Sequence, residues 1–189
     1  MAFDLAASLR RLKPDKRTAP LALRPDTALP FVGDEALGGP PLLLDTTVYI
    51  DVLQGRAPAA VKDLLRVRQI HHSAVALGEL THAFGRLDPG HAGSNAAWSA
   101  IAATIADIPA HRLAAPGIGA FADAGIVTGI IARLRGLAKA DRQPLMNDAL
   151  LFLQALDSGC TLLSRNIGDM DLIDQLVPSG RLLLYRQAD

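Results

Sequence analysis

The sequence has little of what several classes of protein depend on. One cysteine, Cys160, occurs in 189 residues, so no disulfide framework can form and a reducing cytoplasm is the expected compartment. Basic and acidic residues both number 19, and this formal charge of zero excludes a strong global field for nucleic acid, although local patches remain possible. No apolar stretch has membrane-spanning length, and the first residues, MAFDLAASLRRLK, lack the apolar region of a signal peptide. These absences predict a soluble cytoplasmic protein without a membrane partner.

Aromatic residues are also scarce, at 4% of a chain that is half hydrophobic. Aliphatic side chains must therefore build the core. The length is sufficient for one substantial core, which predicts a single main domain.

The first 40 residues differ from the rest. A short helix is predicted that carries Phe3, Leu5, Leu9 and Leu12 on one face. After it, five prolines at positions 14, 20, 25, 30 and 40, followed directly by Pro41, prevent any long helix or strand. Residues 1–26 hold six basic and three acidic side chains, a formal charge of +3. Two interpretations stay open: an arm that touches RNA, DNA or a protein partner, or a segment that packs through its leucines on the body or on a dimer partner. We favour packing, because the leucines need apolar surroundings.

From residue 41 onward, strand and helix patterns alternate. Leu42–Leu44 form an apolar run typical of a strand buried on both faces, and Asp45 follows it directly. The same reasoning predicts further strands over 70–74, 111–115, 161–163 and 182–185, with helices over 46–53, 58–68, 75–87, 95–108, 118–137, 145–158 and 172–177. This alternation predicts βα repeats around a parallel sheet.

Three aspartates come at the ends or beginnings of these elements. Asp45 ends a strand, Asp148 lies in the first turn of an almost wholly apolar helix, and Asp169 follows another strand. A doubly wound sheet can bring all three to one edge. Two carboxylates about 4 Å apart repel by about 4 kcal/mol at an effective dielectric constant near 20, so the cluster requires protons or a cation. All-oxygen ligands favour Mg²⁺ or Mn²⁺, which activate water and neutralise phosphate charge.

Each acid also has a plainer interpretation. Asp45 and Asp148 can cap the helices that they begin, and on its own stretch Asp45 fits both roles equally. Glu79 lies opposite the apolar stripe of the helix over 75–87, so periodicity alone predicts an ordinary surface glutamate.

Four stretches together carry a resemblance to a known family. LLLDTTVYID, SAVALGEL, NDALLFLQAL and TLLSRNIGDMD occur in the order and register of the PIN domain, and residues 42–187 resemble VapC-type toxins of bacterial toxin–antitoxin pairs. The resemblance implies a PIN-like α/β/α sandwich with a central parallel sheet over residues 41–189, preceded by a proline-rich extension over 1–40. It also implies an Mg²⁺- or Mn²⁺-dependent ribonuclease that cleaves RNA, forms a homodimer and is neutralised by an antitoxin protein.

The resemblance assigns roles to particular residues. It implies that the catalytic and metal-binding acids are Asp45, Glu79, Asp148 and Asp169, supported by Thr46, Ser164 and Asn166. Many members have asparagine where Thr47 stands, which puts the geometry around the first acid in doubt, and Asp171 competes with Asp169 for the fourth role. The extension has no counterpart in these small toxins.

Two other functions remain open beside the ribonuclease. The departure at Thr47 and the extension are compatible with a catalytically silent PIN-like binding or assembly module. A phosphatase of the haloacid-dehalogenase type could also use Asp45, but that class needs a second aspartate at the position of Thr47.

Overall fold

The computed structural model describes residues 3–33, 37–137, 142–178 and 181–188, and shows a central five-stranded sheet. All strand pairs are parallel, in the order β3-β2-β1-β4-β5. The strands are β1 (Leu42–Leu44), β2 (Ile70–Ser73), β3 (Leu113–Ala114), β4 (Thr161–Ser164) and β5 (Leu182–Leu184). Each predicted strand is present, and the predicted parallel sheet is confirmed.

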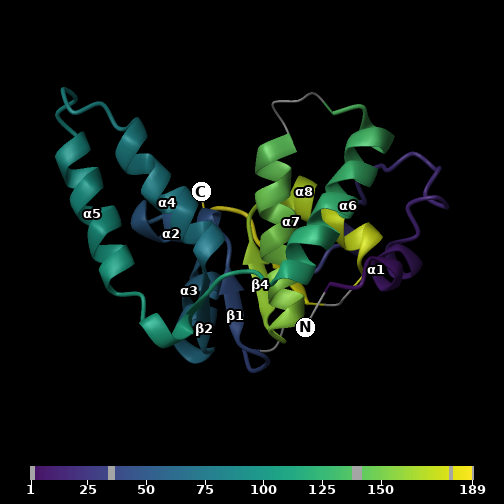
Figure 1. The fold of residues 1–189 in the computed structure, drawn as a ribbon. Coiled ribbons are helices and arrows are strands. Elements are labelled where there is room, and N and C mark those ends of the chain that lie inside the picture. The colour runs from purple at the N-terminus through teal and green to yellow at the C-terminus, as the bar shows by residue number, and fades with distance from the viewer. Residues whose placement is uncertain (1–2, 34–36, 138–141, 179–180, 189) are drawn as a thin grey trace.

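Helices flank this sheet in two groups (Figure 1). They are α1 (Leu5–Leu12), α2 (Thr46–Leu53), α3 (Ala59–Val67), α4 (Ala74–Arg86), α5 (Ser94–Ala106), α6 (Ile118–Arg135), α7 (Arg142–Asp157) and α8 (Ile167–Leu176), with short 3₁₀ helices at Asp26–Ala28 and Ala110–Arg112. Helices α2, α4 and α5 contact one another, and so do α6, α7 and α8. The mixed α/β architecture with helices around an all-parallel sheet confirms the predicted PIN-like fold class.

The strand order places a crevice beside β1. Leu42–Leu44 of β1 pair with Thr161–Leu163 of β4, while the chain that leaves β1 returns in β2 on the other side. Strand order therefore reverses between β1 and β4. In open parallel sheets the carboxyl ends of strands at such a point border the ligand-binding crevice.

Helix α7 is buried nearly all round, as its sequence predicts. Leu151 and Ala149 are completely covered, and Phe152 and Leu153 are almost so. The helix begins at Arg142, however, three residues before the predicted start. Pro144 is accommodated because the first-turn amide groups of a helix lack intrahelical partners. Asp148 consequently lies in the second turn, so the prediction of a first-turn position is wrong, and of its two interpretations the helix cap does not apply.

Helix α8 is longer than predicted at its start. Asn166 accepts a hydrogen bond from the backbone N–H of Asp169 at 3.4 Å and so caps the helix from Ile167. Asp169 is placed in the first turn, where a negative charge is favourable, instead of in a flexible loop around Gly168.

The described part of the N-terminal extension packs along the body. Leu12, on α1, is 1% exposed, and Arg11 forms an ion pair with Asp123 of α6. Leu5 and Leu9, expected to be covered as well, are 53% and 40% exposed. Packing on the body is therefore confirmed for Leu12. Leu5 and Leu9 do not pack on the body, and their packing on a dimer partner stays a prediction.

Beyond α1 the extension continues to the far edge of the sheet (Figure 1). Arg24 pairs with Asp171 and Asp174 of α8 at 2.5 and 2.7 Å. Phe31 then forms a parallel bridge beside Leu184, which covers the outer edge of β5. Among the residues described, no helix combines the length and apolar character needed to cross a membrane.

Candidate active site

Asp45 sits where β1 ends and α2 begins. Its carboxylate caps α2 by accepting from the backbone N–H of Thr47 at 3.4 Å, and it also accepts from the hydroxyls of Thr47, at 2.8 Å, and Ser164. Burial raises the pKa of Asp45, and the nearby charge of Glu79 adds to the increase while these hydrogen bonds oppose it. Asp45 is thus both a helix cap and a buried acid at the crevice, so the two interpretations of this residue are compatible.

Glu79 faces the same crevice from α4. It accepts hydrogen bonds from the Thr46 hydroxyl and, at 2.7 Å, from the side-chain amide of Asn147. The expectation of an ordinary surface glutamate is therefore wrong: α2 and α7 approach the helix face that periodicity assigns to solvent. The sequence predicts no functional role for Asn147. Its place directly before Asp148 was the only sign that it could lie near the site.

Asp148 and Asp169 share one partner. The side-chain amide of Asn166 donates to Asp148 at 2.8 Å and to Asp169 at 3.0 Å. Burial, together with the charges of Asp45, Asp169 and Glu79, raises the pKa of Asp148 to about 9. Asp148 is consequently protonated at neutral pH unless a cation compensates its charge.

Asp171 does not join this group. Its side chain is 1% exposed and accepts from the backbone N–H of Arg24 at 2.8 Å as well as from the Arg24 guanidinium group. Asp171 lies two positions after Asp169 on the same helix, so the helical rotation turns it to the opposite side, toward the N-terminal extension. Of the two competing aspartates, only Asp169 lies at the crevice.

The four acids have the ligand chemistry that a hard divalent cation such as Mg²⁺ requires. Four carboxylates contributed by β1–α2, α4, α7 and α8 supply only oxygen, the ligand atom that Mg²⁺ and Mn²⁺ prefer. In the part of the chain that the structure describes, no group of three His, Cys, Asp or Glu side chains is close enough to hold a metal ion. The carboxylates instead accept hydrogen bonds from the side-chain amides or hydroxyls of Asn166, Asn147, Thr46 and Ser164. Each of the four carboxylates thus accepts at least one hydrogen bond from a neutral donor, and Asp148 and Asp169 share the amide of Asn166.

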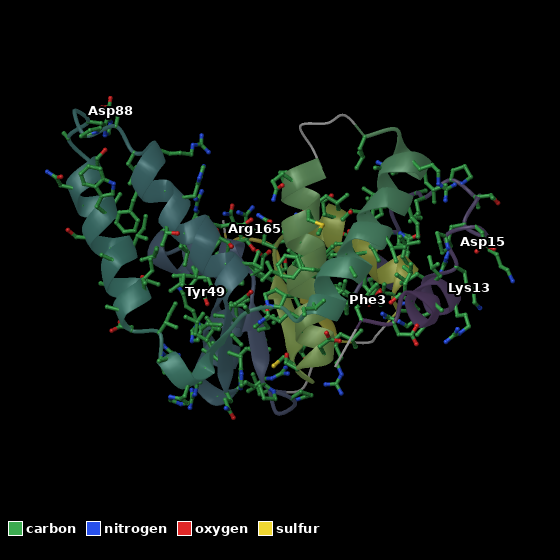
Figure 2. The ribbon with its side chains drawn as sticks, viewed as in Figure 1. Phe3, Lys13, Asp15, Tyr49, Asp88 and Arg165 are labelled. Carbon is green, nitrogen blue, oxygen red and sulfur yellow. The ribbon has the colours of Figure 1, made fainter. Side chains whose placement is uncertain are left out.

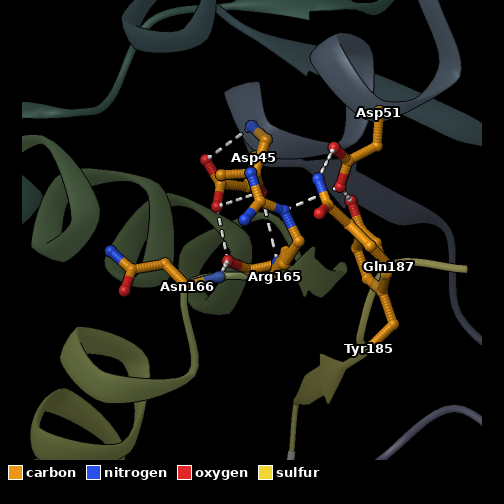
Figure 3. Close-up of polar contacts among 8 residues, drawn as sticks. Asp45, Asp51, Arg165, Asn166, Tyr185 and Gln187 are labelled. Carbon is orange, nitrogen blue, oxygen red and sulfur yellow. Dashed lines mark hydrogen bonds and ion pairs between the residues drawn. The ribbon is translucent and has the colours of Figure 1, made fainter. Parts of the chain in front are cut away.

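A second polar group lies immediately behind Asp45, and the sequence does not indicate it. Asp51 of α2 is bound by Arg165, Tyr185 and Gln187, which come from the ends of β4 and β5 (Figure 3). In the sequence, Asp51 stands out only as a carboxylate among the apolar residues Ile50, Val52 and Leu53.

A groove of about 860 Å³ opens beside Glu79 and Asn147. Its further lining includes His82 and Arg86 of α4 and Phe121 of α6. Aromatic and cationic side chains next to a carboxylate cluster are suited to unpaired bases and phosphates.

Comparisons with known proteins agree with this fold. The sequence matches no family model and no curated protein. In structure, the chain is similar to FitAcB from Neisseria gonorrhoeae, with a TM-score of 0.53 and 19% identity over 76% of this chain and 96% of the other. It is also similar to DNA-bound VapBC from Salmonella typhimurium (TM-score 0.52, 13% identity, 78% and 98% covered) and to VapBC2 from Rickettsia felis bound to a promoter DNA fragment (0.50, 15%, 78% and 98%). At these identities the similarity shows the fold.

Proposed function

We propose that this protein is an Mg²⁺- or Mn²⁺-dependent endoribonuclease that acts in the cytoplasm as the toxin of a toxin–antitoxin pair. One observation carries the proposal: Asp45, Glu79, Asp148 and Asp169 come from four separate elements to the crevice where strand order reverses. Burial, together with the charges of the other three acids, raises the pKa of Asp148 there. The sequence resemblance to VapC-type toxins and the structural similarity to VapBC support the same assignment.

The residues of the chain have distinct roles in this proposal. Asp45, Glu79, Asp148 and Asp169 would hold the cation, which supplies water activation and charge neutralisation at the scissile phosphate. Ser164 and Thr47 orient the Asp45 carboxylate, and Asn166 holds Asp148 and Asp169 beside each other. Such supporting hydrogen bonds set the direction and basicity of metal-binding carboxylates. Thr47, where many members have asparagine, therefore still supports the first acid, through its hydroxyl.

The partners follow from the same assignment. RNA is the substrate, and the groove lined by His82, Arg86 and Phe121 offers a place for an unpaired nucleotide beside the acids. A cognate antitoxin and a homodimer complete the proposal. Their support is the sequence resemblance and, for the antitoxin, the VapBC and FitAcB neighbours.

The proposal is tested by the metal requirement of cleavage. We expect purified protein to cleave single-stranded RNA with Mg²⁺ or Mn²⁺, and excess EDTA to abolish cleavage, because the four acids need a cation to act together. Adding back Mn²⁺ should restore the rate, whereas Zn²⁺ is the poorer match to all-oxygen ligands. Cleavage that persists unchanged in EDTA would contradict the proposal, and absence of cleavage with every metal would favour the silent binding module. A covalent phospho-aspartate at Asp45 would instead identify the phosphatase.

The role of Glu79 is tested by the substitution Glu79→Gln. We expect metal affinity or turnover to fall at least about tenfold, as for other perturbations of metal sites, because glutamine keeps the size of the side chain but removes its charge. Mn²⁺ titration and cleavage rates provide the measurement, with Asp63→Asn in α3 as a control that removes an exposed carboxylate. If Glu79→Gln binds Mn²⁺ and cleaves RNA like the parent, Glu79 only links Thr46 to Asn147.

A further inference from the structure

Asp51 is a fully buried carboxylate that none of the proposed metal-binding roles explains. It is 0% exposed and accepts from Arg165 Nε at 2.7 Å, Tyr185 Oη at 2.9 Å and Gln187 Nε2 at 2.7 Å. Burying a carboxylate is unfavourable unless it is paired and hydrogen-bonded, and these three donors meet that requirement. The group therefore holds the side chain of Arg165 by its Nε in one orientation.

Arg165 is in turn attached to the crevice. Its backbone N–H donates to the Thr47 hydroxyl at 3.2 Å, and that hydroxyl donates to Asp45 at 2.8 Å. In Figure 3 the Arg165 side chain lies between Asp51 and Asp45, with Nε directed to Asp51, and in Figure 2 it lies between the two groups of helices. Two contacts with α2 thus fix Arg165. Its backbone N–H binds Thr47 near the start of the helix, and its Nε binds Asp51 near the end.

The guanidinium group retains free donors. Its side chain is 35% exposed, and only Nε donates to another of the described residues. The two terminal nitrogens have no acceptor in the parts of the chain that the structure describes. A guanidinium group fixed at one nitrogen and open at the others suits a bidentate contact with an oxyanion.

We propose that Arg165 binds a phosphate of the RNA substrate at the rim of the carboxylate crevice, and that buried Asp51 is the residue that positions it. This inference rests on the proposed ribonuclease function and adds a substrate-binding residue to it. The four acids at the crevice repel the negatively charged RNA. The guanidinium group of Arg165, held at the rim by Asp51, lowers that repulsion. Because Asp51 pairs with Nε, the positive charge is oriented in advance and little conformational entropy is lost on binding.

The discriminating substitution is Arg165→Lys. Arginine can serve Asp51 and a phosphate together through different nitrogens, whereas the single ammonium group of lysine pairs with Asp51 or with the phosphate. The Lys variant should therefore fold, with Asp51 still paired, and lose the phosphate contact. Arg165→Gln removes the charge altogether, and Arg66→Gln in α3, where Arg66 has an exposed ion pair with Asp63, is the matched control.

Binding should be measured in an Asp148→Asn background, in which the RNA stays intact, with labelled single-stranded RNA and Mg²⁺. We expect Arg165→Lys and Arg165→Gln to weaken binding about tenfold and to lower the slope of log K against log salt by about 0.7, the value for one phosphate contact on a single strand. Arg66→Gln should match the background protein. A merely structural role for Arg165 would lower the melting temperature but leave the slope unchanged.

The outcomes separate this inference from the proposed function. If the Lys variant folds and keeps the parental affinity and salt slope, the inference is overturned, even where the wild-type protein cleaves RNA. If binding depends on Arg165 but the wild-type protein cleaves no RNA with any metal, the ribonuclease proposal fails and the phosphate-binding role stands. Absence of RNA binding by the background protein overturns the inference as well.

Discussion

Asp148→Asn should abolish RNA cleavage and, in the absence of metal, raise the melting temperature of the protein. Asparagine has the size of aspartate and can accept one hydrogen bond from Asn166, but it carries no charge to hold a cation. Loss of a single electrostatic contact in an active site typically lowers turnover about 10²- to 10³-fold. Asp45→Asn should have the same effect on cleavage, since Asp45 is a buried carboxylate of the same crevice.

The stability change follows from the pKa of Asp148. Its pKa is raised from 3.8 in the unfolded chain to about 9 in the folded protein. The folded state therefore binds the proton more tightly, so the contribution of Asp148 to stability is fully present below pH 4 and is lost as the pH rises toward 9. Asparagine removes this dependence. If the substitution increases the free energy of unfolding by about 2 kcal/mol near pH 8, the melting temperature of a chain of this size rises by about 4–8 °C.

Melting curves in EDTA between pH 5 and pH 9 measure this effect. The gain of Asp148→Asn over the wild-type protein should grow with pH, while the exposed-carboxylate control Asp63→Asn should stay within about 1 °C. If neither Asp45→Asn nor Asp148→Asn folds, the two aspartates serve the stability of the fold and not catalysis. A mutant of either residue that folds and still cleaves RNA at the wild-type rate would remove it from the active site.

Deleting residues 1–38 should strongly destabilise the protein. The deletion removes Leu12, Leu21 and Leu29 from the core and leaves Asp171 buried without Arg24. A buried leucine contributes about 1.5–3 kcal/mol, and an orphaned buried charge costs about 3 kcal/mol, so the sum approaches the total stability of many domains. We expect a fall of at least about 10 °C in melting temperature, measured by calorimetry or circular dichroism.

Single substitutions resolve the contribution of the ion pair. Arg24→Gln should lower the melting temperature by several degrees, because Asp171 and Asp174 both lose their cation, whereas Arg10→Gln on the exposed side of α1 should change it little. A truncated protein with the wild-type melting temperature and oligomeric state, but a shallower salt dependence of RNA binding, would show that the segment guides RNA and does not stabilise the body.

The sequence by itself determined the layered fold. Its apolar runs at Leu42–Leu44 and Thr161–Leu163 and its helical stripes are local signals, and local signals suffice to identify buried parallel strands and the helices between them. Asp45 and Asp148 could be selected as candidate acids for the same reason, since each interrupts an apolar stretch. Helix starts were less certain: α7 and α8 begin earlier than predicted, because Pro144 is tolerated in a first turn and Asn166 supplies a cap.

Only the tertiary structure decided how the remaining polar residues are used. Periodicity assigns Glu79 to solvent, but the approach of α2 and α7 turns that face into one wall of the crevice. Ser164 reaches Asp45 across 119 residues, and Arg165 reaches Asp51 across 114. The resemblance favours Asp169 over Asp171, but the partner of Asp171, Arg24, is 147 residues from it in the chain. These contacts arise from the pairing of β1 with β4 and the course of the N-terminal extension, and no local pattern of residues encodes which distant carboxylate a side chain will meet.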